Sequence, residues 1–482
     1  MDTGEFPGYE FEVPRGPQDG PRHGTGHDSL RQLRYAPQHA QPTQHTRPRS
    51  SVRTAGSGVF AVMRKRNWLL GLAAPILAAV AVGVAVVVIA GGGGGDGAAP
   101  SALAAGFPPA RLAGPDFTGT AKAVRVSLTA IGASSGTEVA AGDANGGPAL
   151  WVSADGGTAW ARAALAGTAA LTRAGTGQLA GVTHGTAGWV AVGSTLAGGG
   201  GPLVAYSPDA RSWTVAGAAA GLGGAGVAAG VAAGPAGYVI VGHQPARADG
   251  AAVATAWYAS GLTGWRRAEV GGQGTSAGQQ MSAVTATAGG FTAVGAAGTG
   301  PAAWLSATGQ TWRQVSLPAP AGAARAALDY AAANGRSVVA TGSEFSATGA
   351  SRPFAEVSTD AGATWAVIPL PEPDAGSGTG TMATALTAAG GGFTATGTYV
   401  TRAGPEVVVW TLPPGTPVTA RAAWTAVAPQ GAGLADATTQ NAVTGLAADG
   451  ATLTGVGFTA AVTGSGTVGA QQPTLWQSPI RY

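Results

Sequence analysis

The chain has 482 residues, a formal net charge of +3 and no cysteine. The absence of cysteine excludes disulfide bonds, a thiol nucleophile and a cysteine metal site. Charged residues make up 10% of the sequence, well below the ~25% typical of soluble domains, and this low charge with many Val, Ala, Thr and Gly residues favours an all-β fold.

The N-terminal segment, residues 1–67, is rich in Pro, Gly, Gln, His and Arg and has no sustained apolar period. Such a segment cannot bury enough apolar surface to offset the entropy of an ordered chain, so we expect a disordered tail. Ten basic and six acidic residues fall in it, which leaves the remaining chain with a net charge of −1. The basic pI therefore belongs to the tail, and no basic stripe elsewhere predicts binding to nucleic acid.

Residues 68–90 form an apolar run of 23 residues without charge, long enough to cross the ~30 Å hydrocarbon core as a helix. Arg64, Lys65 and Arg66 precede it and no positive residue directly follows it. The positive-inside rule then predicts a single-pass membrane protein with a cytoplasmic N-terminus and an extracytoplasmic C-terminal part. A cleaved signal peptide is the alternative, but its apolar region is normally only ~7–15 residues long. Residues 91–120, rich in Gly, Ala and Pro, are expected to be a flexible linker.

From about residue 121 to residue 482, a phrase of small and apolar residues that ends in glycine recurs about every fifty residues. Its seven copies are residues 136–142, 188–193, 237–242, 290–295, 337–342, 392–397 and 451–457. A fixed period of this size indicates a repeat architecture, in which one unit alone cannot bury its apolar face.

One repeat, within residues 279–320, shows how the unit is built. It divides into four apolar or alternating segments separated by Gly-bearing turns: residues 281–287, 291–295, 302–306 and 311–317. Four short strands joined by such turns form a β-meander. In most repeats the third segment carries one tryptophan and the fourth begins with another, whereas the first two hold mainly small residues.

A gradient from small to bulky residues fits wedge-shaped sheets arranged around an axis. Seven copies predict an all-β, seven-bladed β-propeller of four-stranded blades over residues 121–482, preceded by the disordered tail and one transmembrane helix. The last repeat ends in the third-strand position, at residues 475–482. Because a free edge there would invite aggregation, we expect a strand from about residues 107–120 to complete the seventh blade.

The turn between the third and fourth strands carries a second motif. Ser358–Trp365 matches the pattern Ser-x-Asp-x-Gly-x-Thr-Trp in full, and Ser153–Trp160 keeps its Ser, Asp, Gly and Trp. An Asp in a tight hairpin accepts backbone N–H bonds, Gly supplies a positive φ, and Trp is buried between sheets. We assign structural roles to Ser153, Asp155, Gly157, Trp160, Ser358, Asp360, Gly362 and Trp365.

With these motifs in register with the repeat, the chain resembles the Asp-box (BNR-repeat) β-propellers, a group that contains sialidases and many non-enzymatic relatives. The resemblance covers about residues 121–482. It implies that the boxes lie on the face away from the ligand site, so Asp155, Asp209 and Asp360 are expected to be structural rather than catalytic or calcium-binding.

A sialidase-like site, as the resemblance implies, would need three arginines, a Tyr–Glu nucleophile pair and an Asp acid. Of the arginine phrase that enters the first blade in the family, only Arg125 is present, without its aromatic and Pro neighbours. Tyr330 and Tyr399 lie in or at the end of expected strands, but spacing shows no carboxylate partner for either. We therefore expect a non-catalytic member of the family, with no cofactor and no metal.

Charged residues gather in the loops expected between second and third strands, and the candidate ligand-binding set taken from them is Arg247, Asp249, Glu344, Arg352 and Arg402. In a propeller these loops share one face around the axis, although loops are polar in most proteins. The hypothesis is a membrane-anchored, extracytoplasmic binding or scaffold module for a glycan or protein at the bacterial cell surface. A sialidase-like or other glycan hydrolase is the alternative.

Overall fold

The computed structural model describes residues 125–480 and the backbone of residues 109–110, apart from short internal gaps. The gaps are residues 168–176, 196–199, 217–219, 246–250, 272–277, 374–379, 401–404, 430–433, 435–438 and 463–467. The expected tail, the expected membrane span and most of the expected linker lie outside the described residues. Within the described ranges, no helix is both long and apolar enough to span a membrane.

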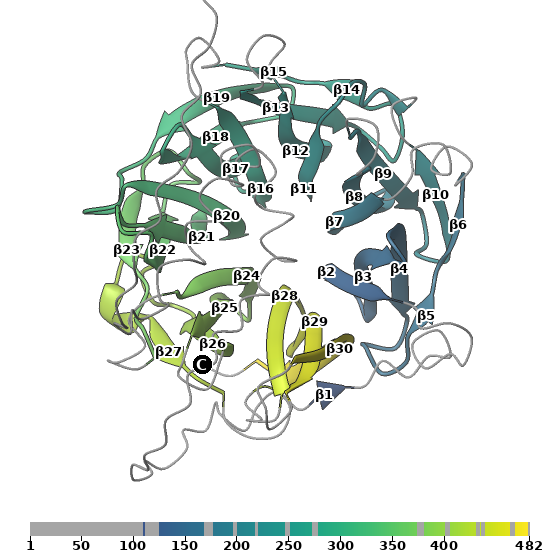
Figure 1. Ribbon diagram of the computed structural model, residues 1–482. Coiled ribbons are helices and arrows are strands. Elements are labelled where there is room, and N and C mark those ends of the chain that lie inside the picture. The colour runs from purple at the N-terminus through teal and green to yellow at the C-terminus, as the bar shows by residue number, and fades with distance from the viewer. Residues whose placement is uncertain are drawn as a thin grey trace, which may run out of the picture. The chain divides into compact units, whose positions relative to one another are not determined.

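The described strands form seven sheets around a central axis, and six of them are built from strands that follow one another in the chain (Figure 1). Blade 1 consists of β2 (Val126–Ser134), β3 (Thr137–Ala144), β4 (Gly147–Ser153) and β5 (Ala161–Arg162). Blade 2 consists of β7 (Gly177–Gly185), β8 (Gly188–Thr195), β9 (Pro202–Ser207) and β10 (Ser212–Ala216). Blade 3 consists of β11 (Val227–Gly234), β12 (Gly237–Pro245), β13 (Ala252–Ala259) and β14 (Arg266–Arg267). Blade 4 consists of β16 (Gln279–Thr287), β17 (Gly290–Ala297), β18 (Gly300–Ser306) and β19 (Thr311–Ser316).

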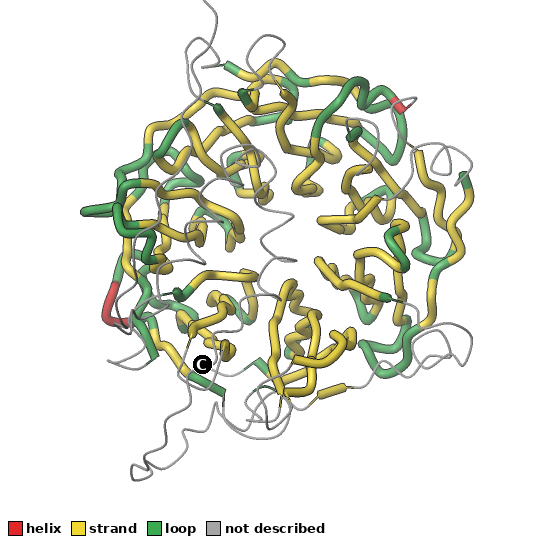
Figure 2. The backbone as a smooth tube through the Cα atoms, in the orientation of Figure 1, coloured by secondary structure: helices red, strands yellow, loops and turns green. Residues whose placement is uncertain are grey.

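The remaining three blades follow the same order from the axis outward. Blade 5 consists of β20 (Arg325–Asn334), β21 (Ser337–Phe345), β22 (Ser351–Ser358) and β23 (Ala366–Pro369). Blade 6 consists of β24 (Met382–Ala389), β25 (Gly392–Val400), β26 (Pro405–Leu412) and β27 (Thr425–Val427), with a three-residue 3-10 helix, η3 (Arg421–Ala423), before β27. Blade 7 contains β28 (Thr439–Asp449), β29 (Thr452–Val462) and β30 (Val468–Pro479). Figure 2 shows that strands and loops make up almost all of this part of the chain.

The seventh blade is completed from the other end of the sequence. The short strand β1 (Pro109–Ala110) pairs antiparallel with β30, with Pro109 opposite Trp476. This is the outer position for which the sequence predicts a strand from about residues 107–120. Around the axis, β28 of blade 7 contacts β2 of blade 1, so the ring of innermost strands is closed.

Two blades have five strands rather than the four that the repeat predicts. The segment that leaves blade 1 forms β6 (Ala164–Ala166), which pairs parallel with β10 of blade 2. In the same way β15 (Glu269–Val270) leaves blade 3 and pairs parallel with β19 of blade 4. Each added strand covers the outer edge of the next blade, which removes an edge that could pair with another chain.

Each innermost strand has a β-bulge at the same point of its pairing with the second strand. The extra residues are Thr129, Ala180, Ala229, Ser282, Asp329, Thr384 and Thr444. Next to each bulge lies the final glycine of the repeated phrase. A Cβ on Gly142 would lie 1.8 Å from the Ser127 carbonyl oxygen, and one on Gly242 would lie 1.8 Å from that of Val227. The bulge places a carbonyl group where a side chain would be, and this contact explains why glycine recurs there.

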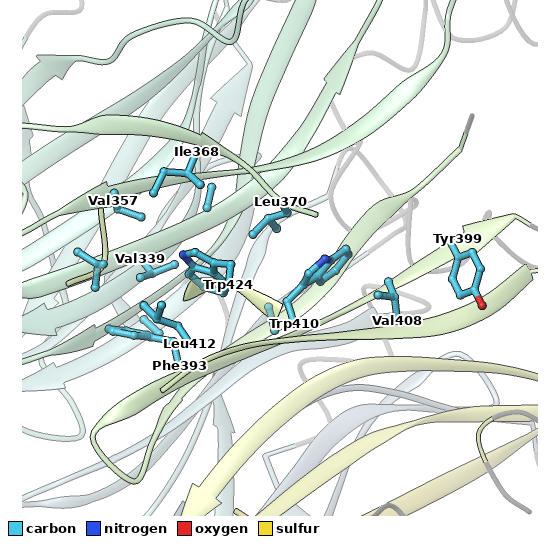
Figure 3. Packing of buried hydrophobic residues seen from close by; sticks show 14 residues of the cluster. Val339, Val357, Ile368, Leu370, Phe393, Tyr399, Val408, Trp410, Leu412 and Trp424 are labelled. Atoms are coloured by element: carbon cyan, nitrogen blue, oxygen red, sulfur yellow. The ribbon is translucent and has the colours of Figure 1, made fainter. Parts of the chain in front are cut away.

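The core of the propeller lies between neighbouring blades. At the interface of blades 5 and 6, Val339 and Val357 pack in one apolar cluster with Phe393, Trp410 and Trp424 (Figure 3). The third-strand tryptophans are at most 1% exposed, namely Trp151, Trp257, Trp304, Trp410 and Trp476. Burial of such large aromatic side chains stabilises each interface by several kcal/mol.

Candidate ligand-binding face

The propeller has two faces that differ in their connections. In an antiparallel meander, the turns from first to second and from third to fourth strand leave at one end of the blade. We call this end the box face, because it carries the Asp boxes. The connections from second to third strand and from one blade to the next leave at the other end, which we call the loop face.

On the box face, the Asp-box side chains bond within their own hairpins. In blade 1, the Ser153 hydroxyl donates to Asp155 Oδ1 at 2.7 Å, and Asp155 Oδ1 accepts the backbone N–H of Ala159 at 2.9 Å. The Gly157 N–H donates to Ser153 Oγ at 2.8 Å, and Trp160 Nε1 donates to the Gly157 carbonyl at 2.9 Å. These bonds fix the hairpin and aim the tryptophan into the blade interface.

The complete box in blade 5 repeats this geometry. Asp360 accepts bonds from the hydroxyl of Ser358 at 2.8 Å and from the backbone N–H and hydroxyl of Thr364 at 2.8 and 2.7 Å, and Trp365 Nε1 donates to the Gly362 carbonyl at 2.7 Å. Burial alone would raise the pKa of Asp360, but the bonds from Thr364 and Ser358 together outweigh it and hold the pKa at about 2. The carboxylate is thus committed to its own turn.

A shallow depression of about 440 Å³ also lies on the box face, where hairpins of blade 4 meet the Asp box of blade 5. Its lining includes Phe291, Leu305, Trp312 and Arg313 together with Asp360. The carboxylate of Asp360 already accepts three bonds in its hairpin. Among the described residues, no group of three or more His, Asp or Glu side chains is arranged to hold a metal ion.

Of the five residues in the candidate ligand-binding set, the structure describes two. Arg247, Asp249 and Arg402 lie outside the described residues. Glu344 and Arg352 do not lie in the loop that the sequence predicts, because β21 and β22 extend further toward the loop face. They stand directly opposite each other in the β21–β22 pair, so their side chains share one face of the sheet.

A third charged residue lies at the same end of blade 5. Arg325 begins the innermost strand β20 and stands opposite Phe345 of β21, with its guanidinium carbon 4.6 Å from the centre of the phenyl ring. This is a cation–π contact, which orients the guanidinium while leaving its N–H groups available. We call Arg325, Glu344 and Arg352 the blade 5 charged cluster; they lie on three neighbouring strands, with Arg325 on the opposite face of the sheet from the Glu344–Arg352 pair.

The sequence did not single out Asp329 as a site residue. Asp329 is the bulged residue of β20, and the corresponding residue in the other six blades is Thr, Ser or Ala. Burial raises the pKa of Asp329 to about 7, although the positive charge of Arg325 opposes the shift. The signal in the sequence was a lone carboxylate in an otherwise neutral run of the innermost strand.

The residues considered for a sialidase-like site lie on three blades. Arg125 is exposed just before β2, and its backbone N–H donates to Asn145 Oδ1 at 2.9 Å. Tyr330 lies on β20 beside Asp329, and burial raises the pKa of its hydroxyl. Tyr399 on β25 donates to Glu406 Oε2 at 2.7 Å, which is a Tyr–Glu pair that spacing did not reveal, but Tyr399 is only 3% exposed.

No protein-family model matches the sequence, and no curated protein matches it either. Several solved structures are similar in fold. YCF48 from Cyanidioschyzon merolae is 12% identical with a TM-score of 0.46, over 77% of this chain and 98% of that chain. A protein of unknown function from Dyadobacter fermentans is 12% identical with a TM-score of 0.42, over 74% of this chain and 95% of that chain. Trypanosoma rangeli sialidase is 12% identical with a TM-score of 0.37, over 73% of this chain and 54% of that chain. At such identities the likeness concerns the fold alone.

Proposed function

We propose that the chain is a membrane-anchored binding or scaffold module, whose propeller lies outside the cytoplasm and binds a polar ligand or partner through its loop face. The observation that supports this most is the blade 5 charged cluster. Charged residues are scarce in the chain, at 10%, yet three of them lie at one end of blade 5, Glu344 and Arg352 on one face of its sheet and Arg325 on the other. Binding residues are commonly placed at strand ends and loops on a rigid scaffold.

The two arginines suit recognition of carboxylate or other anionic groups. A guanidinium presents several donors in a fixed plane and pairs with such groups through two parallel hydrogen bonds. Arg352 is exposed, and Arg325 is held by its contact with Phe345. Glu344 would restrict the site to ligands that also carry a donor, such as a glycan hydroxyl or a peptide N–H.

The proposed anchoring rests on the sequence. The uncharged run of residues 68–90 is long enough to span a bilayer, and the basic residues Arg64, Lys65 and Arg66 precede it. Protease treatment of intact cells provides the test. Digestion of the propeller with survival of the tail supports the orientation, and the reverse pattern contradicts it.

Binding is tested with the full chain in detergent and with cell-wall glycan purified from the source cells. The double variant Arg325→Ala and Arg352→Ala should lower binding at least about tenfold, since each charge-assisted contact is worth ~1.5–3 kcal/mol. A matched variant, Arg162→Ala with Arg266→Ala, removes two exposed arginines of fourth strands. It should bind as the unchanged chain does. Equal binding by both double variants would remove the proposed site.

The second candidate function is glycan hydrolysis, and the observation that favours it is the Tyr399–Glu406 pair. A carboxylate bonded to a tyrosine hydroxyl can accept its proton when the oxygen attacks a sugar. Against this role, burial of Tyr399 leaves a substrate little access to its oxygen. Turnover of a fluorogenic sialoside that Tyr399→Phe abolishes and Arg352→Ala leaves intact would establish the hydrolase and displace the binding module.

A further inference from the structure

Glu138 occupies a position that is apolar or aromatic in every other blade. It lies on the second strand, four residues before the final glycine of the repeated phrase. The corresponding residues are Trp189, Tyr238, Phe291, Val338, Phe393 and Leu453, and all of them are buried. Glu138 is equally buried, with 1% of its surface exposed. A carboxyl group thus stands where the fold elsewhere places an apolar or aromatic side chain.

This position faces the preceding blade. Tyr238 of blade 3 shows the direction, because its hydroxyl donates to the Gly188 carbonyl of blade 2 at 2.8 Å. For blade 1 the preceding blade is blade 7. Glu138 therefore lies in the interface where the last blade meets the first and the ring closes.

Polar contacts join the two blades at this point. The Thr454 hydroxyl of blade 7 donates to Glu138 Oε1 at 2.7 Å. Gln477 Nε2, also of blade 7, donates to the Gly156 carbonyl at 2.8 Å and to Thr454 Oγ1 at 3.3 Å. The N–H of Gly136 donates to the carboxylate of Asp449. We call these residues, together with Glu138, the closing interface.

The second oxygen of Glu138 has no hydrogen-bond partner. It points toward the Asp box of blade 1, since a Cβ on Gly157 would lie 2.6 Å from Glu138 Oε2 and 2.0 Å from Gln477 Nε2. A buried carboxylate oxygen without a partner is costly, whereas the neutral acid is far less so. The geometry thus favours a proton on Glu138.

The charges around Glu138 act in the same direction. Burial raises its pKa; the bond from Thr454 opposes this, and the like charges of Asp449 and Asp155 add to it. Six strands pack near Glu138. Four of them carry no ionisable side chain, namely β2, β4, β29 and β30; the other two carry one each, His184 on β7 and Asp449 on β28. Among these described strands no cation faces the carboxyl group.

We propose that Glu138 makes closure of the ring pH-sensitive: a neutral Glu138 keeps blades 1 and 7 joined, and its deprotonation places an unpaired charge in the closing interface and loosens it. The chain joins each blade directly to the next one, whereas Glu138 of blade 1 and Thr454 of blade 7 are 316 residues apart in the sequence. Besides these side-chain contacts, only the two-residue strand β1, which precedes blade 1 in the chain, pairs with β30 of blade 7 among the described residues. The closing interface and this short pairing must together outweigh the entropy of closing a long loop.

The sign of the effect follows from the raised pKa. A group whose folded pKa lies above its ordinary value, here 4.5, binds more protons in the folded than in the open state. Its contribution to closure is complete below that value and is lost as the pH rises through the folded pKa. Each unit by which the pKa is raised changes the closing equilibrium about tenfold.

The test is hydrogen exchange of the full chain at pH 5 and pH 8, corrected for intrinsic rates. In the unchanged chain, amides of β2–β3 and β28–β29 should lose at least about tenfold protection at the higher pH, whereas those of β20–β21 should not. Glu138→Gln, which is neutral and can still accept the Thr454 bond, should keep its protection at both values. Glu269→Gln, which removes an exposed carboxylate of β15, should behave as the unchanged chain does.

Three results would overturn the proposal. The first is the same loss of protection in Glu138→Gln as in the unchanged chain. The second is a loss spread equally over all seven blades, which would point to a general effect of pH. The third is a Glu138→Gln chain that fails to fold at pH 5, because a neutral side chain of the same shape should keep the interface closed.

Discussion

The interface of blades 5 and 6 and the closing interface of blades 7 and 1 are filled by different kinds of buried side chain. In the first, apolar side chains such as Phe393 and Trp410 fill the space, and the indole N–H of Trp410 donates to the Pro371 carbonyl at 2.7 Å. In the second, Trp151 and Val456 supply an apolar cluster, but Glu138 and Thr454 form a polar contact beside it. The backbone repeat is the same in both.

The difference shows that the sequence repeat determines the strands of each blade. It does not determine whether the interface between two blades is apolar or polar. Burial of apolar surface does not depend on pH, so the interface of blades 5 and 6 should hold over a wide range. A buried carboxyl group adds a contribution to the free energy of unfolding that depends on whether the group is ionised. Substitutions in the two regions should therefore differ both in size and in pH dependence.

The largest effect is expected from Trp410→Ala, at the centre of the apolar interface. Trp410 is fully buried, and removal of such a side chain costs ~3–5 kcal/mol because a cavity remains. Denaturant unfolding of the variant should show this loss equally at pH 5 and pH 8. A loss below ~1 kcal/mol, or one that varies with pH, would contradict the conclusion that apolar burial is the main stabilising contribution at this interface.

The next effect concerns Glu356, which holds the third-strand position that carries tryptophan in five blades. It is fully buried, both of its oxygens lack hydrogen-bond partners, and burial raises its pKa to about 8. Its stabilising neutral form is complete below the ordinary value of 4.5 and is lost as the pH rises through about 8. Glu356→Gln should therefore be more stable than the unchanged chain by roughly 2–4 kcal/mol at pH 9 and nearly equal to it at pH 5.

Glu356 lies in blade 5 and not in the closing interface, so its substitution should act on a different part of the ring from Glu138→Gln. Hydrogen exchange at pH 9 should report the gain in blade 5 and its neighbours, and leave β28–β29 unchanged. A gain confined to blades 7 and 1 would show that Glu356 and Glu138 act through one unfolding transition. Their separate positions predict that the two groups act independently.

The sequence predicted the fold for a clear physical reason. A period of about fifty residues, with tryptophans in outer strands and small residues within, has few ways to bury itself. The roles of Glu138 and Asp329 could not be read in the same way. Burial, the missing partner of Glu138 Oε2 and the contact with Thr454 depend on residues that are distant in the chain. The visible signal was a carboxylate at a position that the repeat makes apolar or small.

Gly242→Ala tests the glycine that ends the repeated phrase, and its expected effect on stability is smaller. The new Cβ would lie 1.8 Å from the Val227 carbonyl oxygen, so the bulge beside it must shift. Overpacking of this kind costs ~1–3 kcal/mol, measured by denaturant unfolding. Gly261→Ala is the control, because nothing lies within 4 Å of its Cβ position; it should change stability by less than ~0.5 kcal/mol. Equal effects of the two variants would mean that the bulge tolerates a side chain.

The smallest effect is expected on the box face, and it has the opposite pH dependence. Hydrogen bonds from Thr364 and Ser358 lower the pKa of Asp360 to about 2 against the opposing effect of burial. A lowered pKa stabilises the fold above the ordinary value of 3.8 and is lost as the pH falls through about 2. Because the carboxylate is largely solvated, screening reduces the gain, and Asp360→Asn should cost less than ~1 kcal/mol at pH 7.

A plot of unfolding free energy against pH measures this effect. Between pH 2 and pH 5 the acid limb of the plot should be shallower for this variant, and the alkaline limb should be unchanged. An altered alkaline limb would show that the box and the buried carboxyl groups are coupled. Independent limbs would mean that acid weakens the hairpins while alkali weakens the interfaces.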